Sequence, residues 1–126
     1  MIYGIGIDLV EIGRTARLLE KYGERFAKRV LTENEQQEFS LSRQPAAFLA
    51  ISFAAKEAFA KAIGSGFRYP VILSHISIAH DRLGKPELRF HPQLKQYLAK
   101  LHIGNHYLSM SDEKNLACAM VILERQ

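Results

Sequence analysis

The sequence predicts a small single-domain α+β protein in which an antiparallel sheet packs against helices. Helical patterns fill most of the first half of the chain, and short apolar strands separated by turn residues fill most of the second. Elements grouped in blocks in this way are typical of the α+β class. A length of 126 residues with 48% hydrophobic content suits one domain with its own core and is too small for two.

The first half contains one expected strand and four expected helical segments. Residues 2–10 are β-branched and apolar, with glycines that allow close backbone approach, which predicts a buried strand. The capping-box pattern of Thr32 and Glu35 starts one helix, and Gly64 ends the longest one. Helices are expected at 13–22, at 24–30 as a continuation after a bend at Gly23, at 33–42 and at 46–63.

The second half reads mostly as hairpins. Alternating apolar residues and turn signals predict them. Strands are expected at 74–80 and 87–90 around a turn at 81–86, a short amphipathic helix at 92–101, and a final hairpin of 107–111 and 116–123 across 112–115.

The charge balance limits the possible partners. A net charge of +4 favours an acidic partner, which leaves nucleic acid, anionic lipid, acidic protein and nucleotide open. A nucleic-acid-binding sheet would need exposed aromatic residues beside lysine and arginine, and the last hairpin offers only Tyr107. We therefore expect no nucleic acid partner.

Cysteine usage and hydropathy indicate the compartment. The single cysteine, Cys118, excludes an internal disulfide and CxxC-type metal sites, and its apolar neighbours predict a buried structural thiol. The N-terminus has no charged leader region, and no apolar run reaches about 18 residues. A soluble cytoplasmic protein without membrane contact is expected.

Two carboxylates lie in otherwise apolar elements. Asp8 belongs to the N-terminal strand and Glu57 to the alanine-rich helix, and isolated charges in such places are costly unless something pairs with them. Mg²⁺ is commonly bound by one or two carboxylates, with waters and ligand phosphates completing the octahedron. The alternatives are that Asp8 caps a neighbouring helix and that Glu57 pairs with Lys61, four residues on.

A lysine and a glycine turn follow the same helix. Lys61 precedes Gly64, Ser65 and Gly66, and glycines let backbone N–H groups approach phosphate oxygens while lysine supplies a point charge. The alternative is an ordinary helix C-cap with a terminal lysine that suits the helix dipole.

Basic residues line one face of the first helical segments. Arg14, Arg17, Lys21, Arg25 and Lys28 fall within an arc of about 80° at a helical period, and Leu18 lies among them. This stripe is typical either of a docking surface for an acidic helix or of a solvated face. A break at Gly23 would misalign its second half.

The whole chain resembles the holo-[acyl-carrier-protein] synthases, the small bacterial 4′-phosphopantetheinyl transferases. Five motifs in the right order carry this resemblance. They are Gly4-Ile-Gly-Ile-Asp8-Leu-Val-Glu11, Arg29-Val-Leu-Thr-Glu-Asn-Glu35, Phe53-Ala-Ala-Lys-Glu57-Ala-Phe-Ala-Lys61-Ala-Ile-Gly-Ser-Gly66, Asp81-Arg-Leu-Gly-Lys-Pro86 and Ala117-Cys-Ala-Met-Val-Ile.

The resemblance implies an activity and a set of roles. Members of the family transfer the phosphopantetheine arm of coenzyme A to a serine of apo acyl carrier protein for fatty acid biosynthesis, with Mg²⁺, and assemble as homotrimers. By the family pattern, Asp8 and Glu57 hold Mg²⁺, and Lys61 contacts the phosphates. The remaining roles fall to Gly64, Ser65, Gly66 and Ser109 around coenzyme A, Gly84, Lys85 and Pro86 at its adenosine end, and Arg14, Arg17, Lys21 and Arg25 at the carrier protein.

Two positions depart from the family pattern. Ser52 stands where the family usually has a basic residue, and Tyr107 where it usually has histidine, with His106 one step earlier on the opposite strand face. Both changes are expected near the coenzyme A phosphates. They leave open a second interpretation, a weakly active or inactive paralogue that binds an acyl carrier protein without efficient turnover.

Overall fold

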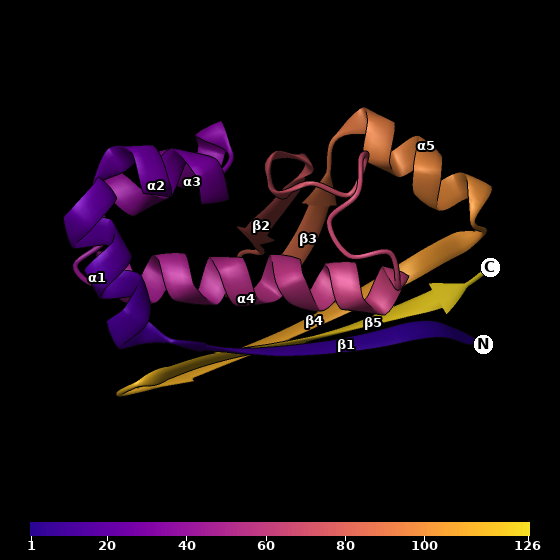
Figure 1. The fold of residues 1–126 in the computed structure, drawn as a ribbon. Coiled ribbons are helices and arrows are strands. Elements are labelled where there is room, and N and C mark those ends of the chain that lie inside the picture. The colour runs from indigo at the N-terminus through magenta and orange to yellow at the C-terminus, as the bar shows by residue number, and fades with distance from the viewer.

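The computed structural model describes residues 1–126, and the long helix α4, Pro45–Ile63, runs through its centre (Figure 1). Pro45 occupies the first turn, where its missing N–H costs nothing, and Gly64 ends the helix at φ 92°. Most residues of α4 from Leu49 onward are buried. A helix that is apolar nearly all round is expected in the interior, and here the other elements pack around it.

A three-stranded antiparallel sheet covers one side of α4. Its order is β1–β5–β4, and β5 pairs with both neighbours. A separate two-stranded antiparallel hairpin of β2 and β3 packs against another side of α4. The bounds are β1 Ile2–Glu11, β2 Ile76–His80, β3 Pro86–Phe90, β4 Ile103–Glu113 and β5 Leu116–Arg125.

Strand β1 lies directly against α4 because two glycines face the helix. A Cβ atom at Gly4 would overlap the carbonyl oxygen of Ala62, and one at Gly6 would overlap that of Ala58. Asp8 follows Gly6 by two residues and therefore points to the same face of the strand. The glycines thus set how closely Asp8 approaches α4.

Helices α1, α2 and α3 form a layer at the N-terminal end of α4 (Figure 1). Gly23, at φ 59° and ψ −141°, separates α1 from α2 and makes the two helices distinct. Thr32 and Glu35 form the expected capping box at the start of α3. The bounds are α1 Ile12–Tyr22, α2 Glu24–Val30 and α3 Glu33–Ser40, and the remaining helix is α5, Pro92–Lys100.

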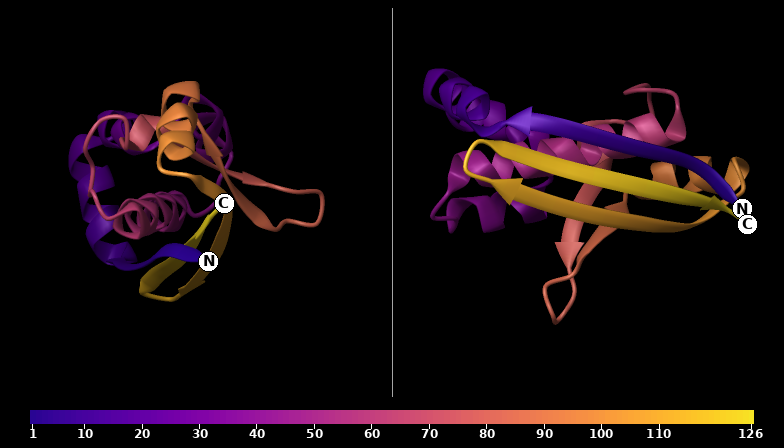
Figure 2. Two further views of the ribbon diagram at one scale, coloured as in Figure 1. Left: turned by 90° about the vertical axis from the view of Figure 1, so that its right-hand side faces the viewer. Right: turned by 90° about the horizontal axis from the view of Figure 1, so that it is seen from below.

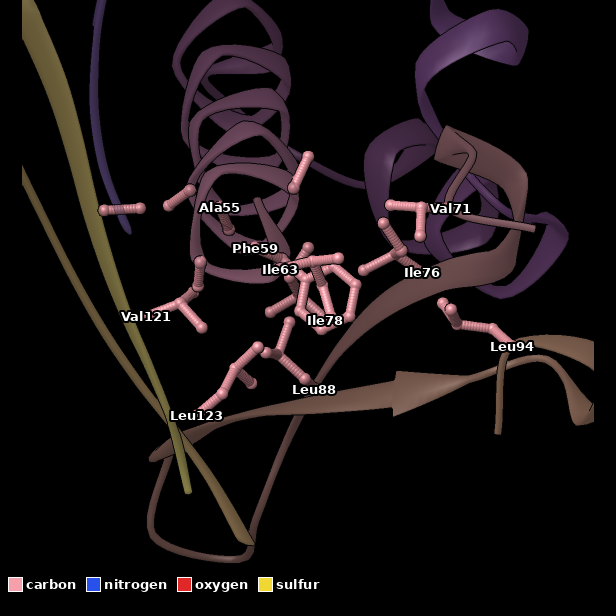
Figure 3. Packing of buried hydrophobic residues seen from close by; sticks show 14 of the residues in the cluster. Ala55, Phe59, Ile63, Val71, Ile76, Ile78, Leu88, Leu94, Val121 and Leu123 are labelled. Atoms are coloured by element: carbon pink, nitrogen blue, oxygen red, sulfur yellow. The ribbon is translucent and has the colours of Figure 1, made fainter. Parts of the chain in front are cut away.

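The main core joins α4 to both sheets and α5. Ala55, Phe59 and Ile63 of α4 belong to one cluster with Val121 and Leu123 of β5 (Figure 3). The hairpin, the preceding loop and α5 complete the cluster with Val71, Ile76, Ile78, Leu88 and Leu94. A second, smaller cluster of Ala27, Val30, Leu31 and Leu49 ties α2 to α4.

The face of the three-stranded sheet that points away from α4 is covered by no element of the chain (Figure 2). Ile5, Ile7 and Leu9 of β1 alternate with the inward-facing residues and are exposed on this outer face. The β2–β3 hairpin projects from the body of the molecule, and the two termini lie side by side (Figure 2). No helix is both long and apolar enough to cross a membrane.

The α+β prediction is confirmed, but two burial predictions are wrong. The strand predicted as buried exposes Ile5, Ile7 and Leu9 on its outer face. Cys118 is only partly buried on the same face, because it alternates with the buried Ala117 and Ala119.

The other differences concern element ends. The helices expected at 33–42 and 92–101 end at Ser40 and Lys100. The strand expected from residue 74 begins at Ile76, because residues 73–75 form a 3₁₀ turn. The first strand of the last hairpin begins at Ile103, four residues before the expected Tyr107, since residues 103–106 pair through an irregularity that sequence patterning does not reveal.

Candidate active site

Asp8, Glu57 and Lys61 meet in one groove between β1 and α4. The Lys61 ammonium donates hydrogen bonds to Asp8 Oδ1 and to the Ile7 carbonyl oxygen, each at 2.9 Å. Glu57 lies one turn before Lys61 on the same side of α4 and lines the same groove, whose volume is about 430 Å³. Residues 49 positions apart in the sequence therefore form one charged cluster.

The electrostatics of Glu57 reflect this crowding. Burial raises the pKa of the Glu57 carboxyl, the negative charge of Asp8 raises it further, and Lys61 opposes both effects. Two carboxylates that share a site disfavour the second negative charge in this way. A cation placed between them would reverse the effect.

Both structural alternatives for the two carboxylates are wrong. Asp8 caps no helix, since α1 begins after Glu11 with no side-chain cap. Glu57 forms no ion pair with Lys61, which pairs instead with Asp8. Neither carboxylate is therefore accounted for by helix capping or by an ordinary i,i+4 pair.

The donor set fits a hard divalent cation that retains other ligands. No three His, Cys, Asp or Glu side chains of the chain converge on one point, so no all-protein metal cage exists. Two adjacent carboxylates are the ligand set with which Mg²⁺ is bound alongside waters and phosphate oxygens. Asp8 and Glu57 are the residues that would hold such an ion.

The groove continues into a second hollow with basic and aromatic walls. Leu18 and Phe26 line both, and the second, with a volume of about 690 Å³, is completed by residues of α1 and α2. These are Tyr22, Arg25, Lys28 and Arg29, while Arg14 lines the first groove. The break at Gly23 moves Arg25 and Lys28 onto another helix, as the sequence allowed, so the five basic residues do not form one continuous helical stripe. Arg17 and Lys21 are exposed on α1.

The glycine turn after α4 has free donors. Gly64 is the C-cap, with its N–H bonded to the Ala60 carbonyl, so the ordinary capping interpretation holds for that residue. The backbone N–H groups of Ser65 and Gly66 donate to no group of the chain, and Gly66 has φ 67°. Consecutive free N–H groups in such a turn are suited to an anion.

The three residues predicted at the adenosine end of coenzyme A lie away from Asp8 and Glu57 within one chain. Gly84, Lys85 and Pro86 belong to the projecting hairpin (Figure 2), where Asp81 accepts hydrogen bonds from the backbone N–H groups of Leu83 and Lys85. These hydrogen bonds, above all that from Lys85, hold the pKa of Asp81 below its ordinary value.

Ser109 also lies apart, because it points to the outer face of the sheet. It pairs with Met120, whereas its neighbour Met110 packs on the core. Tyr107 shares the outer face and donates a hydrogen bond to Glu124 at 2.6 Å. His106 points inward against Phe90 and does not take the place of Tyr107.

Sequence reasoning missed two parts of this region. Leu18 was placed in the basic stripe, but the apolar lining of the grooves by Phe26 and Phe53 was not assigned. The ion pair of Lys56 with Glu35 was not predicted either, since the sequence pattern indicated a role for Glu35 in a capping box. The one available signal was a lysine in an otherwise apolar helical run, which requires a buried partner.

Comparison with known proteins places the chain in a family. Residues 4–121 match the model of the 4′-phosphopantetheinyl transferase superfamily, and the chain belongs to it. Holo-[acyl-carrier-protein] synthase of Nitrosospira multiformis is 62% identical over 125 residues, covering 99% of this chain and all of that protein.

Solved structures agree in fold. The crystal structure of holo-[acyl-carrier-protein] synthase from Neisseria meningitidis has a TM-score of 0.96 at 48% identity, covering 99% of this chain and 100% of that one. That of a holo-(acyl-carrier-protein) synthase from Bacillus anthracis, in complex with CoA (3′,5′-ADP), has a TM-score of 0.84 at 36% identity, covering 100% and 99%.

Proposed function

We propose that this chain transfers the 4′-phosphopantetheine arm of coenzyme A to a serine of apo acyl carrier protein, in fatty acid biosynthesis. The serine hydroxyl oxygen attacks the β-phosphorus of coenzyme A. A new P–O bond forms, the serine hydroxyl proton passes to water, the bond from the β-phosphorus to the α-phosphate oxygen breaks, and adenosine 3′,5′-bisphosphate leaves with that oxygen. The observation that carries the proposal is the cluster of Asp8, Glu57 and Lys61 at one end of a groove whose other end is basic and apolar.

Lys61, together with a cation held by Asp8 and Glu57, would neutralise and position phosphate. Asp8 and Glu57 would hold Mg²⁺, which when bound supplies positive charge at the pyrophosphate oxygens. Lys61 reaches this place with a side chain that is 52% exposed, so its ammonium is accessible to a ligand phosphate beside Asp8. Phosphoryl transfer depends mainly on such positioning and charge neutralisation.

Coenzyme A would follow the end of α4. The free N–H groups of Ser65 and Gly66, next to Gly64, are donors for the pyrophosphate oxygens. Gly84, Lys85 and Pro86 would contact the adenosine end, with Ser109 near the phosphates. Because the hairpin and Ser109 lie apart from Asp8 in one chain, we place these contacts between neighbouring copies.

An acidic helix of the carrier protein would occupy the basic groove. Arg14, Arg17, Lys21 and Arg25 are exposed. Arg14 and Arg25 line the grooves together with the apolar residues Leu18 and Phe26. Positive charge around an apolar floor steers and orients an acidic amphipathic helix. With the carrier helix on this surface, the serine that accepts the arm would lie in the groove near Asp8 and Glu57.

The uncovered sheet face supports assembly into a homotrimer. Ile7 is 57% exposed between Ile5 and Leu9, and Met120 and Leu116 of β5 extend the same apolar face. A continuous apolar patch of this kind marks an interface. Copies of this chain that meet there would bring the outer-face residues of one chain toward the groove of another.

The cytoplasm is the proposed compartment. Cys118 is free, so the fold depends on no disulfide and is compatible with a reducing environment. A weakly active or inactive paralogue is the alternative. It rests on Tyr107, which is engaged with Glu124, and on Ser52, which is buried in α4.

Intact-mass spectrometry tests the proposal. An acidic apo acyl carrier protein is incubated with the chain, coenzyme A and Mg²⁺, with and without a chelator. A gain of one phosphopantetheine that the chelator suppresses supports the transferase. No gain with a folded chain and excess coenzyme A would favour the carrier-binding paralogue and make Ser52 and Tyr107 the residues to restore first.

A further inference from the structure

Lys56 lies one residue before Glu57, but its side chain points into the interior and belongs to another network. Its side chain is 0% exposed, and its ammonium donates to three acceptors: Val30 O at 2.6 Å, Glu35 Oε1 at 2.7 Å and Leu73 O at 3.2 Å. A buried charge is tolerated only when it is paired and fully hydrogen-bonded, as this one is. The candidate active site does not use it.

Glu35 extends the network to further elements. Its Oε1 accepts a hydrogen bond from the Thr32 backbone N–H at 2.8 Å, and its Oε2 accepts one from the Ile78 backbone N–H at 2.8 Å. The Lys56–Glu35 pair therefore joins α4 to the end of α2, the start of α3 and strand β2. No buried side-chain nitrogen or oxygen atom of the chain is left without a partner.

Helix α2 is held by this pair at its C-terminal end, in addition to its apolar contacts with α4. It has seven residues, too few to be stable without tertiary contacts. Its N-cap is Gly23, which provides no side-chain cap. Its last carbonyl, that of Val30, is bound by the Lys56 ammonium, and a cation at a helix C-terminus is favourable. The N-terminus of α2 thus begins at a glycine without a side-chain cap, and its C-terminus is bound by Lys56.

Helix α2 also supplies a wall of the proposed docking groove. Phe26, Arg25, Lys28 and Arg29 line it, and none of them contacts Lys56 or Glu35 through a hydrogen bond or an ion pair. We propose that Lys56 and Glu35 are positioning residues for the carrier protein: they fix α2 against α4 so that its basic and aromatic side chains face the groove in one arrangement. A surface fixed before binding loses less conformational freedom on binding.

This inference rests on the proposed function, since it takes the occupant of the groove to be an acidic carrier protein. Lys56→Met keeps most of the side-chain volume and removes the ammonium. The KM for apo carrier protein is expected to rise about tenfold, while kcat and the KM for coenzyme A change by less than about twofold. The backbone amides of residues 24–30 are expected to exchange faster with deuterium.

Leu94→Ala is the matched control for lost stability. Leu94 is fully buried in the main core on α5 and belongs to no part of the groove. Its truncation is expected to lower Tm without changing the KM for carrier protein or the exchange of residues 24–30. A control that raises this KM as much as Lys56→Met would overturn the positioning role.

The double variant Lys56→Met with Glu35→Gln keeps the inference testable if Lys56→Met alone does not fold. It removes both charges and leaves an amide oxygen to accept from Ile78, while Val30 still loses its donor. If the wild type transfers phosphopantetheine but the variants keep an unchanged KM for carrier protein and unchanged deuterium exchange in α2, the positioning role is overturned and the proposed function stands. A folded wild-type chain that transfers nothing would contradict the proposed function, and exchange of residues 24–30 in the variants would still decide the role of the pair in fixing α2.

Discussion

Lys61 and Asp8 form the only ion pair of the candidate active site, with 2.9 Å between Nζ and Oδ1, and Glu57 lies beside them without a counter-ion. The cluster therefore holds two carboxylates and one ammonium. Burial of Glu57, and then the negative charge of Asp8, raise the pKa of the Glu57 carboxyl, and the excess of carboxylates suits the groove to one more cation.

The raised pKa of Glu57 predicts a pH dependence of stability in the absence of metal. The folded chain binds this proton more tightly than the unfolded chain, so the stabilisation is present below the ordinary glutamate pKa and is lost as pH rises through the raised value. At neutral pH in chelator, Glu57→Gln is expected to have a higher Tm than the wild type, and the difference should vanish below pH about 4. Thermal unfolding at a series of pH values measures it, and a less stable variant at neutral pH would contradict it.

Thermal unfolding with added Mg²⁺ tests whether Glu57 binds the ion. Mg²⁺ is expected to raise the Tm of the wild type and to leave that of Glu57→Gln unchanged, because the variant lacks one ligand charge. Equal shifts for both proteins would place the ion elsewhere.

Gly6 controls the approach of β1 to α4. Gly6→Ala places a Cβ atom on the Ala58 carbonyl and is expected to cost about 2–4 kcal/mol of stability and to lower transfer strongly, because Asp8 is displaced from Glu57. Gly13→Ala is the control, since the nearest atom to its Cβ is a flexible Arg17 nitrogen at 3.7 Å. Urea unfolding and transfer rates report both, and a Gly6→Ala chain with normal stability and rate would refute the account of this contact.

Charge reversal tests the docking surface. Arg14→Glu with Lys21→Glu is expected to raise the KM for acyl carrier protein at least about tenfold and to leave that for coenzyme A nearly unchanged, since exposed charges steer the acidic partner. Lys95→Glu with Lys100→Glu changes the net charge equally on exposed positions of α5, away from the groove. Equal effects of the two double variants would show that net charge alone matters.

A charged substitution on the outer face of β1 tests whether the chain assembles through this face. Ile7→Lys places a charge in the uncovered apolar face and is expected to convert the proposed trimer to monomers that fold but transfer poorly. Light scattering coupled to size-exclusion chromatography measures the mass. A wild-type chain that is already monomeric and fully active would contradict the shared site.

Periodicity and capping residues predicted most elements, because those signals are local. Thr32 with Glu35 and the glycine after Ile63 marked helix ends that the structure confirms. The extension of the final hairpin back to Ile103 depends on pairing with β5 and had no local signal. The approach of Asp8 to Glu57 was proposed from apolar context, whereas the pairing of Lys61 with Asp8 over Glu57 depends on the close contact of β1 with α4, which only tertiary packing determines.

The most direct test of the acid pair is the rate of transfer to apo acyl carrier protein as a function of Mg²⁺ concentration, for the wild type, Asp8→Asn, Glu57→Gln and the exposed control Asp112→Asn. The wild type and the control are expected to saturate with Mg²⁺. The two site variants are expected to lose at least about a hundredfold in rate while remaining folded, because each removes a ligand charge. Near-normal rates and the same Mg²⁺ dependence in both site variants would contradict the assignment of Asp8 and Glu57.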